Sequence, residues 1–318
     1  MEHSKDALLS VIVPAHNEQG NISAVIQCLS PLLSREGIRH ELIFVNDGSS
    51  DNTWDEIKRS SGQFSQVRGV CLSRQFGKEA AIYAGLQSAA GDCCVVMDCD
   101  LQHPPEKIPE MWRLWLQGYE IVEGVKHDRG DEHALYGLGA KCFYRLISRS
   151  TGIDMQRSSD FKLLDRKAVL VLLNMPERNT FFRALSSWIG FKTTQIEFDV
   201  QPRAAGKSSW STWGLIRYAI KNITSFSSAP LQIVTFLGFL MLLASVLQGG
   251  EALYRWAIGE AVEGFTTVIL LQLFTGSLLM ISLGIIGYYI SRIYEEVKGR
   301  PRCVISETCG DPPDSRDQ

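Results

Sequence analysis

The sequence predicts an α/β domain with a mostly parallel β-sheet, followed by an amphipathic helix and two membrane-spanning helices. Three patterns in the 318 residues support this prediction. Short apolar runs alternate with helical patterns up to about residue 200, and this order builds parallel sheets with helices on both faces. A helix with separate apolar and basic faces comes next. Two long apolar stretches without Asp, Glu, Lys or Arg follow it, as in membrane spans.

The apolar runs of the first part have the length of β-strands. They cover residues 8–13, 41–46, 67–72, 93–98, 120–125, 159–164 and 193–200. Helical patterns separate them at residues 21–33, from Thr53 onward, and at 78–89, 106–116 and 179–189. Ligands of such sheets bind beyond the carboxyl ends of the strands, so the residues after each strand are the first candidates for a site.

The two apolar stretches, residues 230–248 and 265–290, each supply about the 20 residues that a helix needs to cross a bilayer. A buried hairpin is the alternative, but soluble cores rarely hold two such runs. Basic residues precede the first stretch and follow the second, whereas the loop between them holds Arg255 among three glutamates. The positive-inside rule therefore predicts that both chain ends are cytoplasmic.

Four parts are expected along the chain: a soluble domain at 1–208, an interfacial helix at 209–228, a transmembrane hairpin at 229–292 and a cytoplasmic tail at 293–318. A helix packed on the soluble domain is the alternative for 209–228. The tail is expected to be disordered from Glu307 onward. A net charge of −3 disfavours a nucleic-acid partner. The eight cysteines form no CxxC pair, which predicts reduced thiols in a reducing compartment.

An acidic triplet, Asp98-Cys99-Asp100, ends the fourth expected strand. Side chains two residues apart on a strand point the same way, with α-carbons roughly 6–7 Å apart. Two carboxylates held so close repel each other unless one is protonated or a cation is near. Mg²⁺ and Mn²⁺ prefer oxygen ligands and bridge carboxylates to phosphates, and Gln102 adds an oxygen on the same side. Such triplets also occur in solvated turns, but the position after a buried strand favours a metal–phosphate site.

Two other strand ends carry polar residues that fit a nucleotide. Asp47 follows the second strand and is a candidate acceptor for a base N–H, while Gly48-Ser49-Ser50 forms a turn that lets a ligand approach the backbone. Asp51 or Ser50 is expected to cap the helix from Thr53. We therefore expect three strand ends to form one site.

Three motifs at these strand ends resemble the signatures of inverting family 2 glycosyltransferases. They are Pro14-Ala15-His16-Asn17-Glu18, Val45-Asn46-Asp47-Gly48-Ser49-Ser50-Asp51 and Met97-Asp98-Cys99-Asp100-Leu101-Gln102-His103-Pro104. More narrowly, the chain resembles the polyprenyl-phosphate glycosyltransferases, a group that includes bactoprenol glucosyltransferases and dolichyl-phosphate mannose synthases. Further matching stretches lie at residues 76–79, 159–164, 175–179 and 290–294. Tyr288 departs from the family pattern, which often has a glutamate there.

The resemblance implies a GT-A-type nucleotide-sugar fold and a set of site residues. A Mg²⁺ or Mn²⁺ ion is implied for Asp98, Asp100 and Gln102. Nucleotide-sugar contacts are implied for Pro14, Asn17, Glu18, Asp47, Lys78 and Asp98. Catalytic roles are implied for Asp160, as the proposed base beside the acceptor, and for Asp100 and Arg203. Contacts to the acceptor phosphate are implied for Arg129, Arg203, Lys207 and Ser208.

The expected activity is inverting transfer of a hexose, from UDP-glucose, onto polyprenyl phosphate at the cytoplasmic membrane face. A phosphate monoester has a second pKa near ~6 and is already mostly ionised at neutral pH, so we expect Asp160 mainly to orient groups. Mannosyl transfer from GDP-mannose is the alternative. A processive polysaccharide synthase is disfavoured because Ala252 stands at the Gln position of a Gln-x-x-Arg-Trp segment. A non-catalytic scaffold is disfavoured by the intact acidic residues. The bilayer is an expected partner. The sequence leaves the oligomeric state open, and homo-oligomers are one option because paired spans often self-associate.

Overall fold

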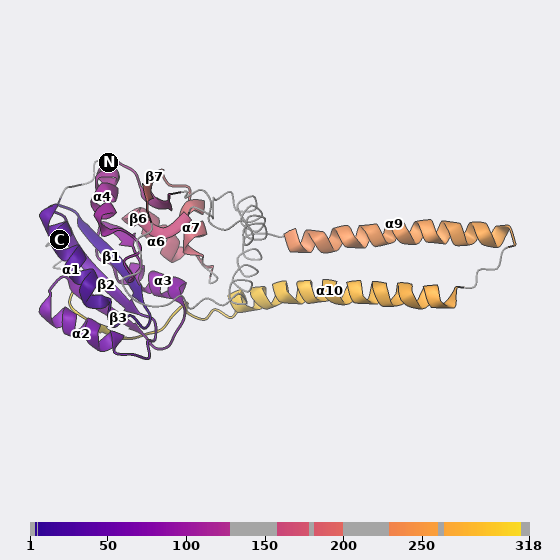
Figure 1. Ribbon diagram of the computed structural model, residues 1–318, viewed down its shortest axis with the longest axis horizontal. Helices are drawn as coiled ribbons and strands as arrows, with labels where there is room; N and C mark the ends of the chain where they lie inside the picture. Colours follow the sequence, from indigo (N-terminus) through magenta and orange to yellow (C-terminus); the bar gives the residue numbers. More distant parts are fainter. Residues whose placement is uncertain are drawn as a thin grey trace. The chain divides into compact units, whose positions relative to one another are not determined.

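The computed structural model describes residues 4, 6–127, 158–177, 181–199, 229–259 and 264–312. The chain divides into two compact units (Figure 1). One unit comprises Met1–Ser211 together with Pro301–Gln318, and the other is Thr212–Arg300. The segment after the second long helix therefore belongs to the same unit as the N-terminal part of the chain.

The first unit is built on an eight-stranded sheet with the order β7-β5-β6-β4-β1-β2-β3-β8. Parallel pairs join β1 to β2, β1 to β4, β2 to β3 and β5 to β7, whereas β6 is antiparallel to β4 and β5, and β8 is antiparallel to β3. The strands are β1 (Leu8–Ala15), β2 (Arg39–Asn46), β3 (Val67–Leu72), β4 (Cys93–Val96), β5 (Ile121–Lys126), β6 (Ser158–Asp165), β7 (Thr193–Phe198) and β8 (Ile305–Cys309).

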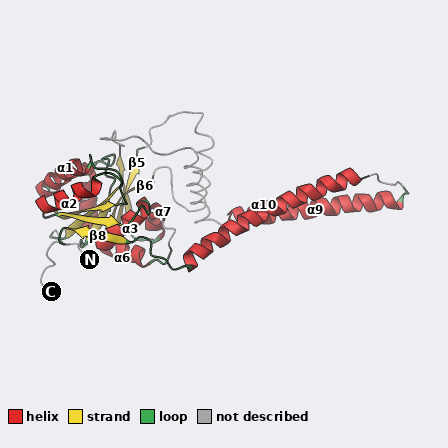
Figure 2. Ribbon diagram, turned by 90° about the horizontal axis from the view of Figure 1, so that it is seen from below, coloured by secondary structure: helices red, strands yellow, loops and turns green. Residues whose placement is uncertain are grey.

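Helices cover both faces of this sheet. The chain adds β2 and β3 on one side of β1 and then returns to place β4 on the other side. Because crossovers between parallel strands are right-handed, this reversal puts α1 and α2 on one face and α3 on the other, together with α6 (Figure 2). The helices are α1 (Ile22–Arg35), α2 (Thr53–Gln63), α3 (Lys78–Ser88), the short 3₁₀ turn η1 (Pro105–Lys107), α4 (Ile108–Leu116), α6 (Arg166–Asn174) and α7 (Phe182–Trp188).

The core lies on both sides of β1. Leu9, Val11 and Val13 belong to one buried cluster with residues of α1 and α4, as the alternation of side chains along a strand requires. Ile12 faces α3, which approaches so closely that a Cβ on Gly85 would lie 2.3 Å from Ile12 Cγ2. A glycine at this position therefore sets the distance between α3 and the sheet.

The structure confirms the predicted fold class. The parallel strands β1, β2 and β4 end on the same side of the sheet, so their carboxyl ends lie close together. β4 and β1 are neighbours at the point where the strand order reverses, the usual place for a ligand site in such sheets. Two elements were not predicted: α6, and the edge strand β8.

β8 corrects the expectation of disorder from Glu307 onward, because Glu307, Thr308 and Cys309 lie in this strand. The polar composition of this segment gave no strand signal, because a strand at the end of a sheet pairs on one side only. Trp54 Nε1 donates to Glu307 Oε2 at 2.8 Å, and Ser306 Oγ donates to the Cys71 carbonyl at 3.1 Å. These contacts hold β8 against β3 and α2.

The second unit contains two long helices, α9 (Ala229–Ala257) and α10 (Phe265–Val297), that run side by side (Figure 1). Within them, Val234–Ala252 and Leu271–Val297 are long and apolar enough to cross a membrane by length and composition. Hydroxyls on α10 donate to carbonyls one turn earlier, as Ser277 does to Leu273 at 2.8 Å, which satisfies polar groups without water. The predicted spans fall within these helices, whereas the predicted interfacial helix at 209–228 lies outside the described residues.

Candidate active site

The acidic triplet lies in a tight loop directly after β4. Leu101 has φ = 57°, a left-handed conformation that a branched side chain rarely adopts, and Asp100 Oδ1 accepts the Gln102 N–H at 3.1 Å. His103 Nδ1 accepts the Asp98 N–H at 3.1 Å, and its ring is buried against Phe161, with centroids 5.1 Å apart. Burial lowers the pKa of His103 despite the nearby Asp98 charge. A neutral histidine thus fixes the backbone of Asp98.

Lys78 joins the triplet to a second carboxylate, which is buried. Its ammonium is 2.6 Å from Asp98 Oδ1 and 2.7 Å from Asp160 Oδ2. Asp160 comes from β6, and its side chain is only 4% exposed. Arg183, on α7, binds the same carboxylate through two nitrogens, at 2.7 Å and 3.0 Å. Four charged side chains from the β4 loop, α3, β6 and α7 therefore form one connected group, which we call the Asp98–Arg183 chain: Asp98, Lys78, Asp160 and Arg183.

The charges of this chain keep its carboxylates ionised. Burial alone would raise the pKa of Asp160, but Lys78 and Arg183 hold it well below its ordinary value of 3.8. For Asp98, the charge of Lys78 likewise outweighs burial and lowers the pKa. Burial opposes the charge on Lys78, yet Asp160 and Asp98 raise its pKa. Each group thus favours the charged form of its neighbour.

Glu79 follows Lys78 directly, but its pKa is shifted upward, in contrast to those of Asp98 and Asp160. Burial, and then the charge of Asp160, raise its pKa from 4.5 to about 7. Its Oε2 accepts the Phe182 N–H at 2.8 Å, at the start of α7. α3 therefore supplies one contact to Asp160 and one to the helix that carries Arg183.

The ends of β1 and β2 form a second part of the site through side chain–backbone bonds. Asp47 accepts the N–H groups of Phe76 and Gly77 at 2.7 Å and 2.9 Å, and so positions the start of α3 and Lys78. Asn17, with φ = 57°, accepts the Ser50 N–H at 2.9 Å and donates its own N–H to Ser49 Oγ at 2.9 Å. These bonds shape the turns that were expected to meet a nucleotide.

Gly48 is required by both conformation and space in this region. Its φ is +60°, and a Cβ there would lie 2.3 Å from the Gln75 nitrogen and 2.4 Å from the Arg74 carbonyl carbon. Both neighbours are backbone atoms, so neither can rotate away. The glycine lets the β2–α2 turn pack directly on the loop before α3.

The predicted cap by Asp51 or Ser50 is wrong in position: the N-cap of α2 is Asn52, which forms no side-chain cap bond. Asp51, one residue earlier, accepts the Thr53 N–H through Oδ1 at 3.0 Å. Glu18 donates its N–H to Thr53 Oγ1 at 2.9 Å, so the β1 end is tied to the start of α2. Pro14 lies in β1 opposite Val45 of β2.

The structure places Lys78 in contact with both Asp98 and Asp160, and Asp100 and Gln102 lie in the loop that follows Asp98. Their roles in binding a metal ion and a nucleotide sugar stay predictions. The remaining predicted site residues, Arg129, Arg203, Lys207 and Ser208, lie outside the described residues. Sequence reasoning missed the roles of His103, Glu79 and Arg183. His103 stood inside a quoted motif and Glu79 beside Lys78, but no local pattern connects Arg183 to Asp160.

The donor set of the triplet suits a hard divalent cation that is shared with a phosphate. In the part of the chain that the structure describes, no three His, Cys, Asp or Glu side chains gather closely enough to hold a metal ion by themselves. Asp98 and Asp100 offer two carboxylates and Gln102 an amide oxygen. Mg²⁺ usually takes one or two carboxylates and completes its shell with substrate phosphates and water. The residues therefore fit Mg²⁺ or Mn²⁺ bound together with a diphosphate.

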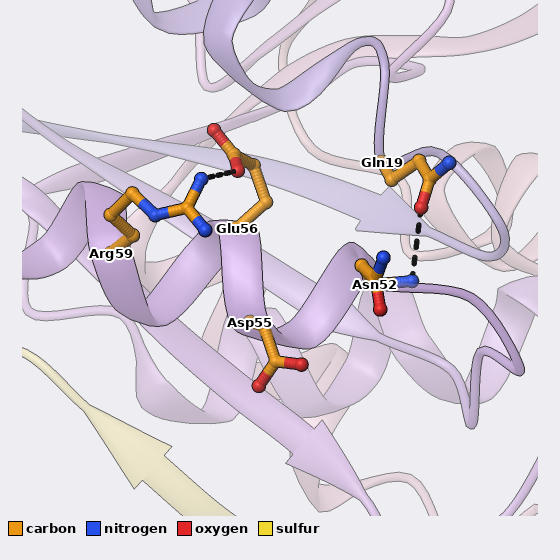
Figure 3. Close-up of a pocket in the computed structure, with 5 residues that line it drawn as sticks. All are labelled: Gln19, Asn52, Asp55, Glu56 and Arg59. Carbon is orange, nitrogen blue, oxygen red and sulfur yellow. Dashed lines mark hydrogen bonds and ion pairs between the residues drawn. The ribbon is translucent and has the colours of Figure 1, made fainter.

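A surface pocket of about 460 Å³ lies elsewhere, against α2 (Figure 3). Its lining charges are already paired: Arg59 binds Glu56, and Asp55 is 3.1 Å from Lys58. The Gln19 side chain accepts the Asn52 N–H at 3.1 Å (Figure 3). The Asp98–Arg183 chain, whose charges converge on the buried Asp160, is therefore a better candidate for a functional site than this exposed pocket.

Comparison with known proteins identifies the family. The model of the family described as Glycosyl transferase family 2 matches residues 10–172. An uncharacterized glycosyltransferase of Synechocystis sp. is 38% identical over 95% of this chain and 96% of its own length. The bactoprenol glucosyl transferase of Shigella phage SfII is 34% identical, over 94% of this chain and 98% of its own.

Among solved structures, the chain is similar to glucosyl-3-phosphoglycerate synthase from Mycobacterium tuberculosis in complex with Mn²⁺, UDP-glucose and phosphoglyceric acid. The identity is 23% and the TM-score 0.47, over 69% of this chain and 78% of the other. The family match and the full-length relatives agree with the motifs at the carboxyl ends of β1, β2 and β4. The chain belongs to glycosyl transferase family 2.

Proposed function

We propose that this glycosyltransferase moves a hexose from a nucleotide sugar onto a polyprenyl phosphate at a membrane surface, with inversion at the anomeric carbon. The observation that carries the proposal is the Asp98–Arg183 chain, in which a buried, ionised Asp160 is joined through Lys78 to the triplet. Similarity over almost the full length to a bactoprenol glucosyl transferase supports a lipid-phosphate acceptor. The two long apolar helices support a bilayer as the place of reaction.

The proposed reaction is a single displacement. An oxygen of the acceptor phosphate attacks the anomeric carbon and forms the new C–O bond. The bond from that carbon to the nucleoside diphosphate breaks, and its electron pair leaves with the diphosphate. Because the phosphate monoester is largely ionised near pH 7, no proton has to be removed from the nucleophile.

This proton balance agrees with the environment of Asp160. A general base works best when its pKa lies near the working pH, whereas Lys78 and Arg183 hold the pKa of Asp160 well below 3.8. The carboxylate is therefore a weak base, and its oxygens already accept hydrogen bonds from Lys78 and Arg183. We propose that Asp160 holds Lys78 and Arg183 toward the two phosphate-bearing substrates, and that these cations aim and neutralise them.

Asp98, Asp100 and Gln102 are the residues proposed to hold a Mg²⁺ or Mn²⁺ ion, which when bound supplies positive charge for the leaving diphosphate. On the nucleotide side, Asp47 already uses both carboxylate oxygens to hold the backbone before α3. Spare lone pairs on these oxygens leave room for a base N–H. Pro14, Asn17 and Glu18 remain predicted donor contacts, and Arg129, Arg203, Lys207 and Ser208 remain predicted acceptor contacts.

The membrane topology is proposed from the ends of the two-helix unit. β8 follows α10 in the sequence and pairs with β3, in the same sheet as all strands that precede α9. If both helices cross a bilayer, this pairing requires the tail and the catalytic sheet to lie on the same side. The pairing agrees with both ends on one side of the membrane, and the charge pattern alone predicts that this side is cytoplasmic.

UDP-glucose is the proposed donor, and mannosyl transfer from GDP-mannose is the competing activity. The test is a panel of radiolabelled nucleotide sugars incubated with polyprenyl phosphate and the full chain in detergent, with and without Mn²⁺. Label that enters the organic phase only with UDP-glucose, polyprenyl phosphate and enzyme together is the expected result. Label from GDP-mannose would replace the proposed donor, and no label from any sugar would refute the proposal.

A further inference from the structure

We propose that the buried pair of Lys162 and Glu123 positions Arg183 against Asp160 by fixing helix α7 to the sheet; its expected effect on turnover rests on the proposed function. Lys162 lies on β6 two residues after Asp160, and its side chain is 0% exposed. Among the hydrogen bonds and ion pairs that the structure describes, neither residue contacts Asp160, and Lys162 interacts with its charge only at longer range. Both residues contact α7 directly.

The ammonium of Lys162 uses its three donors on neighbouring elements. It donates to Glu123 Oε1 on β5 at 2.6 Å, to Ser186 Oγ at 2.8 Å and to the Arg183 carbonyl at 3.1 Å. The last two partners belong to α7. One buried side chain therefore holds the backbone of Arg183, while the side chain of that same residue binds Asp160.

Glu123 completes the attachment. Its Oε1 also accepts from Ser187 Oγ at 2.8 Å, and its Oε2 accepts from Gln195 of β7 at 3.3 Å. Its side chain is 9% exposed. Burial alone would raise the pKa of Glu123, but the charge of Lys162 lowers it. Burial lowers the pKa of Lys162, and the charge of Glu123 opposes that shift.

α7 depends on such contacts because it has only seven residues. A helix of that length is not stable alone in water. At its first residue, Phe182, the backbone N–H is bound by Glu79. The Lys162–Glu123 pair holds the middle of the helix, at Arg183, Ser186 and Ser187.

A positioning role predicts a result that a purely structural role does not. Replacing a buried ion pair by apolar residues of similar size often leaves stability unchanged or raises it. Lys162→Met/Glu123→Met removes both charges together and leaves no unpaired buried group. If the pair serves only stability, this variant folds and works. If the pair positions Arg183, the variant folds but α7 loses its attachment.

The test combines hydrogen exchange with a double-mutant cycle on the full chain in detergent. For Lys162→Met/Glu123→Met we expect exchange in the α7 peptide to be at least about tenfold faster, with the α2 peptide within about twofold of wild type. We expect kcat to fall about 10- to 100-fold, with KM for the donor within about threefold. Adding Arg183→Met should lower kcat by no more than about threefold below Arg183→Met alone, because both changes remove the same interaction.

The matched control is Lys107→Met/Glu110→Met, which removes a partly exposed surface pair in the η1–α4 segment, and should change kcat by less than about twofold. Unchanged exchange in α7, or losses in kcat that multiply with Arg183→Met, would overturn the inference. If the apolar variant does not fold, Ser186→Ala removes one acceptor of Lys162, and we expect about threefold faster exchange in α7. If the wild type transfers no sugar, the proposed function fails, and the exchange of α7 still decides the role of the pair.

Discussion

Lys78→Met tests the junction of the Asp98–Arg183 chain. The variant keeps the length of the side chain but removes an ammonium that contacts Asp98 at 2.6 Å and Asp160 at 2.7 Å. A hydrogen bond to a charged group contributes about 1.5–3 kcal/mol. Because Lys78 is 40% exposed, solvent screening reduces each contact toward about 1–1.5 kcal/mol. Together they give about 2–3 kcal/mol, or a loss of about 30- to 150-fold in kcat/KM.

The assay is transfer of labelled hexose to polyprenyl phosphate under single-turnover conditions, so that product release does not hide the effect. Lys58→Met is the matched control, because Lys58 is 41% exposed and is paired with Asp55 on the surface of α2. The two lysines differ in their partners and not in their exposure. Activity of Lys78→Met within about threefold of the Lys58→Met variant would refute a role for Lys78 in the reaction.

Three further changes test the surroundings of the site and the core. Glu79→Gln should flatten the pH dependence of the free energy of unfolding. Because the pKa of Glu79 is raised, its stabilising contribution is present below pH 4.5 and is lost as the pH rises through about 7. Denaturation of both proteins at pH 5 and pH 8 measures this difference. Gly48→Ala should lower the free energy of unfolding by about 2–3 kcal/mol and weaken UDP binding. The control Gly37→Ala has φ = +69° but open space around its Cβ, and it should lower the free energy of unfolding by about 1 kcal/mol. Gly85→Ala should destabilise the protein by about 1–2 kcal/mol through the contact with Ile12. The control Gly62→Ala in α2 has open space around its Cβ and should stabilise the protein by about 0.5–1 kcal/mol. Equal melting temperatures for these two variants would contradict the packing argument.

The strands and most helices of the sheet were predictable because their patterns are local. The run Leu9, Val11 and Val13 alternates with side chains for the other face, and all three are buried in the structure. The carboxyl-end motifs were predictable for a related reason, since parallel strands bring their ends to one edge. The antiparallel insertion of β6 between β4 and β5 was not, because pairing direction leaves no periodic signal in the sequence.

The unpredicted parts depend on contacts between distant residues. β8 is stabilised by β3 and by the bond between Trp54 and Glu307, which are 253 positions apart, and its five residues carry no strong apolar pattern. Lys162 is misleading for another reason: sequence rules place lysine at the surface, yet this one is fully buried and paired. A buried charge can be inferred only when its partner is known, and Glu123 is 39 positions away.

The charges of the site suggest a reason why Asp160 is kept ionised between Lys78 and Arg183. In the Asp98–Arg183 chain the two carboxylates and the two cations cancel, and Asp100 adds a negative charge. A nucleotide sugar carries a diphosphate and the proposed acceptor a phosphate, so both substrates bring negative charge to a site that is not positive by itself. We propose that the missing positive charge comes from a divalent cation at Asp98 and Asp100 and from basic residues such as those predicted at Arg129, Arg203 and Lys207. Asp160 then holds Lys78 and Arg183 in place between two anions, a role for which a permanently charged carboxylate is better suited than a base that alternates between two protonation states.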